Sequence, residues 1–196
     1  DCALLTLVHS PTEFRMFKTE HFVPSSEQLV VTGADPGRRV VSEINGEPAA
    51  VEYARIYDVP TEALTPMVFA THPVTVTLGG SVFVRSIQKV NDDGSLTFFC
   101  AIDEGIVLRV ARGGDMVENL ADAFAGVVRE IGVPALVLGC DCVLRYLEIE
   151  QARLRPAIDA LMTRHNVIGF ATYGEQYNAM HVNQTFTGVA IAATGG

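Results

Sequence analysis

Four short apolar runs between residues 74 and 113 constrain the fold of this chain most. They read VTVTLG, SVFVRSIQKV, SLTFFCAI and IVLRVA, and the turn signals GG, NDDG and DEG separate them. β-Branched and aromatic residues favour strands, whereas Gly, Asn and Asp favour the tight turns between strands. Such runs at short, regular spacing predict an antiparallel meander.

Further strands are predicted nearer the N-terminus. CALLTLVHS at the start is typical of a buried strand, and QLVVT at 28–32 is a second short β-branched run. The breaker cluster GADPGRR at 33–39 is the best candidate for a domain boundary. A strand ending at Ile44, the turn pair Asn45-Gly46 and an amphipathic helix between about Pro48 and Pro60 are predicted to follow.

The hydrophobic period changes in the second half of the chain. In GDMVENLADAFAGVVREIG the apolar residues recur at helical spacing, Asp115 and Glu118 form a capping signal, and Gly132 is a plausible end. A buried strand PALVLGCDC, a helix with Pro156 in its first turn, and closing strands in NVIGFATYGE and QTFTGVAIAA are predicted next. The predicted fold class is α+β, with a largely antiparallel sheet and covering helices.

Composition and charge exclude several classes of partner. The 196 residues are 48% hydrophobic, which is enough to bury the core of one domain or of a domain with a small appendage. The net charge of −9 repels nucleic acid and anionic membrane surfaces. The chain has no apolar run of about 18 residues that would span a membrane. The CDC pair is too tight for a mutual disulfide, so we expect a reducing cytoplasm.

Two segments concentrate polar and reactive side chains. GxxxxGK[ST], HExxH, GxSxG and a GxGxxG after a strand are all absent, which removes the main support for standard nucleotide-binding and hydrolase functions. LGCDCVLRYLE at 138–148 and ATYGEQYNAMHVNQTFTG at 171–188 instead place polar groups at the ends of apolar strands. We predict that the two turns lie at one end of the sheet and line one pocket.

The predicted ligand-binding residues come from these two segments. Amides and phenols donate and accept hydrogen bonds, so the set suits an amino acid or another small polar molecule. Glu175 can meet an ammonium group and Arg145 a carboxylate, and in the empty site we expect Glu175 to face solvent or to pair with Arg145. The set is Cys140, Cys142, Arg145, Tyr173, Glu175, Asn178, His181 and Asn183.

Several of these residues also have alternative interpretations. Cys140 and Cys142 are either two buried thiols or part of a metal site with His181. Arg145 and Glu148 stand three residues apart, so they can simply pair on a helix surface. His181 is either a structural histidine or a ligand of haem iron or of another metal.

Arg85 stands in the otherwise apolar run VFVRSI. An arginine in such a strand either points to solvent or meets a buried anion. The alternation of side chains along a strand favours solvent.

Four segments together resemble the C-terminal half of FIST proteins, which are bacterial intracellular sensory modules that also occur in eukaryotic F-box proteins. The segments are VVSEINGEPAAVEYA, VFVRSIQKVNDDGSLTFFCAIDEG, GCDCVLRYLE and IGFATYGEQYNAMHVNQTFTGVAIA. Residues 37–196 resemble the FIST C-terminal domain, and residues 1–36 resemble the tail of a preceding FIST N-terminal domain.

The resemblance implies a non-catalytic module that senses a small molecule and acts on an output protein such as a histidine kinase or a diguanylate cyclase. The subgroup it resembles is the haem-containing, nitric-oxide-sensing FIST proteins, so haem is an alternative cofactor, with His181 as its candidate ligand. A second hypothesis is an enzyme with Cys140 or Cys142 as nucleophile, His181 as base and Asn178 or Asn183 as orienter. A third is a protein-interaction scaffold, as in the F-box relatives.

Overall fold

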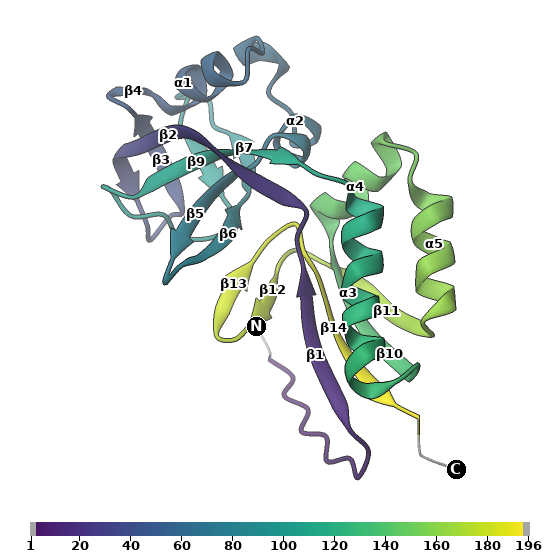
Figure 1. Cartoon of the computed structure of the whole chain (residues 1–196). Helices are drawn as coiled ribbons and strands as arrows, with labels where there is room; N and C mark the ends of the chain where they lie inside the picture. The colour runs from purple at the N-terminus through teal and green to yellow at the C-terminus, as the bar shows by residue number, and fades with distance from the viewer. Residues whose placement is uncertain (1–2, 194–196) are drawn as a thin grey trace.

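The computed structural model describes residues 3–193, and most of its strands form two sheets that meet at a narrow junction (Figure 1). The larger sheet is curled and antiparallel, with strand order β6-β5-β9-β2-β3-β8-β7, and β4 pairs with β3. Its strands are β2 (Phe22–Asp35), β3 (Val40–Ile44), β4 (Glu47–Pro48), β5 (Val74–Leu78), β6 (Ser81–Arg85), β7 (Ile87–Val90), β8 (Leu96–Phe98) and β9 (Val107–Gly113).

The predicted strands form, but they do not make a simple meander. β5–β6 and β7–β8 are hairpins, whereas β6 and β7 lie at opposite edges of the sheet and β9 pairs with β5 and β2. The long strand β2 follows β1 in the chain and lies at the centre of the sheet, where it pairs with β9 and β3. The breaker cluster at 33–39 forms the turn between β2 and β3, which are paired strands of the same sheet.

Short helices cover the curled sheet. Asn45 and Gly46 have φ of 54° and 81° and form the predicted tight turn before α1 (Ala49–Ile56). Tyr53 of α1 and Phe69 of α2 (Pro66–Thr71) are completely buried or nearly so, and they belong to the same core as the inward side chains of the strands. A 3-10 turn, η1 (Thr61–Ala63), connects the two helices.

The smaller sheet has the order β1-β14-β10-β11, and only the β10–β11 pair is parallel. Three helices cover one of its faces, so the predicted α+β class with a largely antiparallel sheet is confirmed (Figure 1). The elements are β1 (Phe14–Thr19), α3 (Met116–Ile131), β10 (Pro134–Cys142), α4 (Val143–Gln151), α5 (Arg155–Arg164), β11 (Val167–Thr172) and β14 (Phe186–Ala192).

Helix α3 begins and ends as its sequence predicts. The Asp115 carboxylate accepts hydrogen bonds from the backbone N–H groups of Val117 and Glu118, each at 2.9 Å. Gly132 ends the helix with φ of 74°, a conformation in which glycine has no Cβ penalty. Pro156 lies in the first turn of α5, as predicted. None of the helices within residues 3–193 is long and apolar enough to span a membrane.

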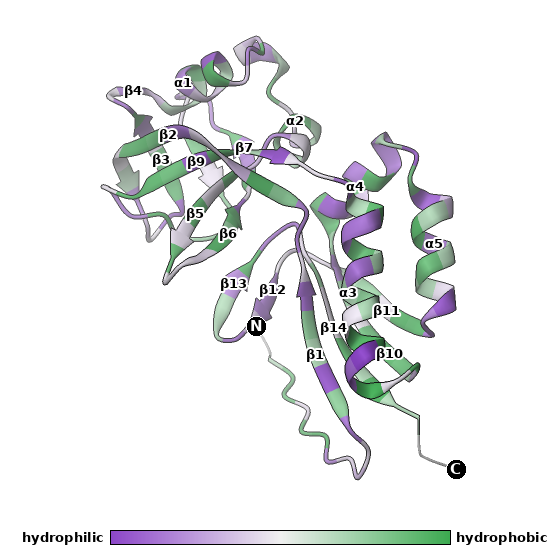
Figure 2. Ribbon diagram, in the orientation of Figure 1, coloured by the Kyte–Doolittle hydropathy of each residue, from purple (hydrophilic) through white to green (hydrophobic). Residues whose placement is uncertain are grey.

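The strands of the smaller sheet are rich in hydrophobic residues (Figure 2), and several of their apolar side chains are exposed. Leu138 lies beside Ile168 on β11, and both side chains are about half exposed. Residues 3–10, predicted as part of a buried strand, form no strand, and Leu4, Leu5 and Leu7 are 94–95% exposed. Cys2 of the same prediction lies outside the described residues.

Candidate functional site

The two predicted polar segments meet at the C-terminal ends of β10 and β11. Cys142 pairs with Thr172 in parallel register, and β12 (Glu175–Tyr177) begins three residues later. Since parallel strands end at the same edge of a sheet, the two turns lie at one end of it, as the sequence predicts. That they line one pocket stays a prediction. β12 and β13 (Met180–Val182) form a hairpin that lies between the two sheets (Figure 1).

Glu175 is a buried carboxylate that has no cationic partner among the described residues. Thr172 donates a short hydrogen bond to Oε1, and Thr185 donates one of 2.6 Å to Oε2. Burial raises the pKa of Glu175; the threonine bonds lower it, and the nearby charge of Asp141 adds to the rise. The expectation that Glu175 faces solvent or pairs with Arg145 is therefore wrong.

Arg145 is the largest completely buried side chain of the described structure. Its Nε lies 3.0 Å from Oδ1 of Asp141, an ion pair without the alignment of a hydrogen bond. Nη1 and Nη2 have no hydrogen-bond partner within residues 3–193. Burial raises the pKa of Asp141, and the Arg145 charge opposes this rise. The alternative of a surface pair between Arg145 and Glu148 is wrong, because Arg145 occupies the buried face of α4.

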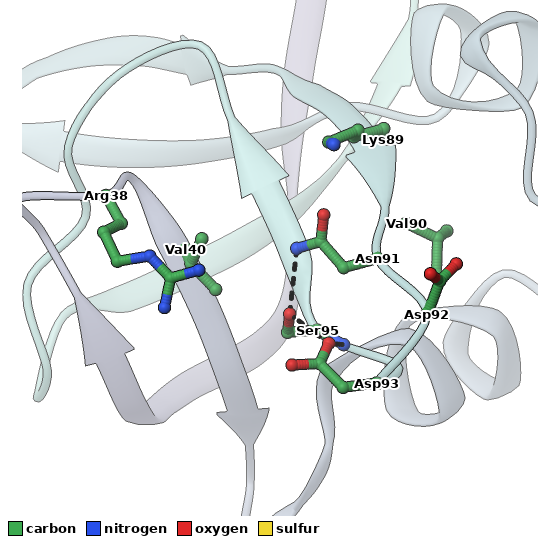
Figure 3. A pocket seen from close by; sticks show the side chains of 8 residues that line it. All are labelled: Arg38, Val40, Lys89, Val90, Asn91, Asp92, Asp93 and Ser95. Atoms are coloured by element: carbon green, nitrogen blue, oxygen red, sulfur yellow. Dashed lines mark hydrogen bonds between the residues drawn. The ribbon is translucent and has the colours of Figure 1, made fainter.

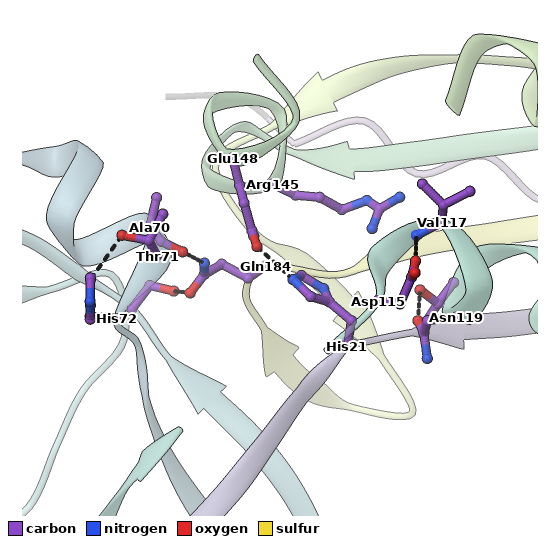
Figure 4. Close-up of polar contacts among 12 residues, drawn as sticks. His21, Ala70, Thr71, His72, Asp115, Val117, Asn119, Arg145, Glu148 and Gln184 are labelled. Atoms are coloured by element: carbon purple, nitrogen blue, oxygen red, sulfur yellow. Dashed lines mark hydrogen bonds and ion pairs between the residues drawn. The ribbon is translucent and has the colours of Figure 1, made fainter. Parts of the chain in front are cut away.

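Glu148 instead contacts His21 at the junction of the two sheets (Figure 4). The His21 Nε2 to Glu148 Oε1 distance is 2.8 Å, and the His21 side chain is 1% exposed. The carbonyl of His21 accepts a 2.8 Å hydrogen bond from the backbone N–H of Gly114, which lies between β9 and α3. Glu148 of α4 therefore contacts the segment between β1 and β2, and that segment is hydrogen-bonded to the segment between β9 and α3. These two segments connect the sheets. The sequence pattern of residues 14–35 does not single out His21 for this role.

The two thiols of the CDC segment are protonated at neutral pH. Cys142 packs against Ala70 and Leu144, and burial together with the Glu175 charge raises its pKa to about 11. The same causes raise the pKa of Cys140. Within residues 3–193 no three His, Cys, Asp or Glu side chains are placed to hold a metal ion, so the metal site with His181 is wrong.

His181 and Asn183 lie side by side at the end of the hairpin. The Asn183 amide donates to His181 Nε2 at 3.1 Å. Burial and the charges of Arg85 and Arg39 lower the pKa of His181, so its ring is neutral. Asn183 is completely buried, and its Oδ1 has no hydrogen-bond partner in the described part of the chain. A Cβ at Gly174 would lie 2.7 Å from Cε1 of His181, so a side chain there would displace the ring.

The adjacent Gln184 connects this end of the smaller sheet to the curled sheet (Figure 4). Its side-chain oxygen accepts a 3.2 Å hydrogen bond from Ser86, and its amide nitrogen donates to the carbonyl of Ala70. The remaining two candidates lie apart from these buried groups. Tyr173 is 79% exposed, and Asn178 is an exposed residue of the β12–β13 turn.

The buried and partly buried polar groups at the ends of β10 and β11 form what we call the strand-end cluster. It combines one guanidinium, two carboxylates, one thiol, one amide and two hydroxyls. Its members are Asp141, Cys142, Arg145, Thr172, Glu175, Asn183 and Thr185. Asp141, Thr172 and Thr185 are the members that the sequence analysis missed, although each directly neighbours a polar segment or belongs to one.

A surface cavity of about 340 Å³ lies on the curled sheet, beside the turn at Asp93-Gly94 (Figure 3). The Asn91 amide donates to Ser95 Oγ at 2.9 Å, and Asp93 accepts from the backbone N–H of Ser95 at 3.0 Å. These polar groups hold the turn between β7 and β8, in which Gly94 has φ of 79°. Their placement agrees with the prediction of a tight turn at this position.

Comparison with known proteins identifies one family. A model described as the FIST C domain matches residues 49–178, from the start of α1 to the tip of the β12–β13 hairpin. No curated protein and no solved structure matches the chain.

Proposed function

Because the chain belongs to the FIST C domain family of sensory modules, we propose that it senses a small amino-acid-like ligand through the strand-end cluster. In this proposal the output is a separate signalling protein, such as a histidine kinase or a diguanylate cyclase. The observation that carries the proposal is the completely buried Arg145, whose Nη1 and Nη2 have no partner within residues 3–193.

An arginine remains charged at all physiological pH values, so burial without sufficient partners is costly. Leaving one buried polar group unsatisfied costs about 1–3 kcal/mol, and more for a charged group. Asp141 contacts only Nε, and it is itself disfavoured as an anion by burial. A ligand carboxylate that accepts from Nη1 and Nη2 of Arg145 supplies the missing acceptors in a bidentate geometry.

A positively charged ligand group would complement two other members of the cluster, Glu175 and Asn183. Glu175 has no cation beside it, and Oδ1 of Asn183 has no donor in the described part of the chain. An ammonium group supplies both a positive charge and three donors. A single α-amino acid carries the carboxylate and the ammonium group together, so one ligand offers both kinds of missing partner.

The surroundings of His181 favour a polar ligand over haem. An axial histidine presents a free ring nitrogen to the iron. Nε2 of His181 accepts from Asn183, and the ring packs directly against the backbone of Gly174. Because Nε2 is already bonded to Asn183, the proposal takes the amino-acid-like ligand.

The same electrostatics favour a binding module over a cysteine-dependent enzyme. A thiolate is the nucleophilic form of cysteine, and reactive cysteines lie in electropositive surroundings. Cys142 lies instead near the Glu175 carboxylate, and its pKa of about 11 keeps it protonated. His181 contacts Asn183 rather than either thiol.

A ligand screen by thermal unfolding tests the proposal. We expect one or a few α-amino acids to raise the Tm in a saturable manner, since a ligand at a hundred times its Kd stabilises by about 2.7 kcal/mol. The amine and the carboxylic acid that share the side chain of the active amino acid serve as controls, and each should stabilise far less. A Soret band in freshly purified protein, together with no effect of any amino acid, would contradict the proposal.

A further inference from the structure

Arg85 is buried at the end of β6, with 8% of its surface exposed, so the expectation that it points to solvent is wrong. Its Nη1 donates to the carbonyls of Val84 and His181 at 3.2 and 3.4 Å. No carboxylate of residues 3–193 forms an ion pair with it. Nε and Nη2 make no hydrogen bond to the described residues and are not sealed from solvent.

A second arginine reaches the same region from the turn between β2 and β3. Nη1 of Arg39 donates to the carbonyl of Phe99 at 3.2 Å. The backbone N–H of Phe99 in turn bonds to the carbonyl of Ser86, the residue that follows Arg85. Both guanidinium groups are therefore held by backbone carbonyls, which fixes their positions without neutralising their charges.

The charges of both arginines act on the same neighbours. Each lowers the pKa of His181 and of the Cys100 thiol, although burial is the larger influence on both groups. His181 is neutral and cannot offset the arginines. In a chain with a net charge of −9, two neighbouring arginines with no carboxylate partner form a local positive site.

We propose that Arg39, Arg85 and the β12–β13 hairpin at His181 form a second ligand site, which binds the phosphate group of a small molecule. Guanidinium groups present paired N–H donors that match phosphate oxygens, and a dianion offsets both arginine charges. Nε and Nη2 of Arg85 remain available for these bonds. The site adjoins the strand-end cluster through the hydrogen bond between Asn183 and His181, and it goes beyond the amino-acid-like ligand proposed there.

Inorganic phosphate is the probe for a direct test by isothermal titration calorimetry. We expect saturable binding to the wild type in a chloride buffer of constant ionic strength. Arg85→Gln and Arg39→Gln should each weaken binding about tenfold or more, since a charge-assisted hydrogen bond contributes about 1.5–3 kcal/mol. Arg38→Gln is the matched control, because this arginine lines the cavity beside Asp93 instead, and its phosphate affinity should equal that of the wild type.

NMR titration of the His181 imidazole supplies a second measurement. Bound phosphate should raise the His181 pKa, and Arg85→Gln should raise it without phosphate, because both changes remove uncompensated positive charge. Absence of saturable binding, or equal binding by wild type and Arg39→Gln, would overturn the proposal. Arg39 is exposed, so its variant decides the question even if Arg85→Gln fails to fold. Tighter binding of succinate than of phosphate would overturn the ligand class.

Discussion

Arg145 Nε lies 3.0 Å from Oδ1 of Asp141, across the boundary between β10 and α4. This pair joins the last residues of a buried strand to the first turn of a helix. It orients the guanidinium but leaves Nη1 and Nη2 without partners in the described structure. The contact therefore positions Arg145 for an additional acceptor.

Asp141→Asn should leave the free energy of unfolding of the empty protein unchanged at pH 7 or raise it, because burial already disfavours the Asp141 carboxylate as an anion. Urea denaturation measures this change. A ligand carboxylate then meets Arg145 without a competing anion, so the stabilisation by the active amino acid should be larger in Asp141→Asn than in the wild type. A loss of about 3 kcal/mol would show instead that the Asp141 charge compensates Arg145 in the folded protein.

Glu175→Gln should change how stability depends on pH. Burial raises the pKa of Glu175 above its ordinary value of 4.5, so the folded protein holds this proton more tightly than the unfolded chain. Stability should therefore fall as pH rises from 4.5 through the raised pKa. The glutamine has no such proton and should flatten this slope. Asp141, whose pKa is also raised, should leave a residual slope of the same sign.

Free energies of unfolding at intervals between about pH 4 and pH 8 check this prediction, with Glu118→Gln on the surface of α3 as the control. Identical slopes in wild type and Glu175→Gln would mean that the folded-state pKa of Glu175 is not raised.

Cys142 should resist alkylation in the folded protein at pH 8. Its pKa of about 11 leaves very little thiolate, and its side chain is buried. Mass spectrometry of the peptide that contains Cys140 and Cys142 distinguishes the two sites after iodoacetamide treatment. Modification of Cys142 should become fast only in denaturant. Fast modification under native conditions would return the cysteine-dependent enzyme to consideration.

Gly94→Val should lower the free energy of unfolding by about 1–2 kcal/mol, because a β-branched residue is strained at the φ of 79° found there. Gly94→Asn is the matched control and should cost less, since asparagine tolerates positive φ. Chemical denaturation measures both variants. The affinity of the folded protein for its amino acid should stay unchanged, and a selective loss of affinity at full stability would assign the turn to the site.

The sequence predicts local features of this fold better than its long-range pairing. The Asp115 cap and the Asn45-Gly46 turn depend on neighbouring residues, and both form as predicted. The strand order of the curled sheet depends on the pairing of β2 with β9, which lies far along the chain, and turn spacing carries no information about it. The division into residues 1–36 and 37–196 stays a prediction.

The same distinction applies to the candidate site. The two polar segments could be placed together because their strands end at one edge. The partners within the cluster could not be predicted, since a carboxylate such as Glu175 has many potential donors in the sequence and burial selects among them. Alternation along β6 likewise did not predict the burial of Arg85, because the β12–β13 hairpin covers that end of the strand.

Calorimetric titration of the amino acid that gives the largest thermal shift tests the central claim most directly. Arg145→Lys should weaken its binding at least tenfold, since lysine cannot form the bidentate contact, and Glu175→Gln should weaken it through the loss of negative charge. Arg164→Lys, at the exposed end of α5, should bind like the wild type. If Arg145→Lys and Glu175→Gln both fold and bind every tested ligand with wild-type affinity, the strand-end cluster is not the sensory site.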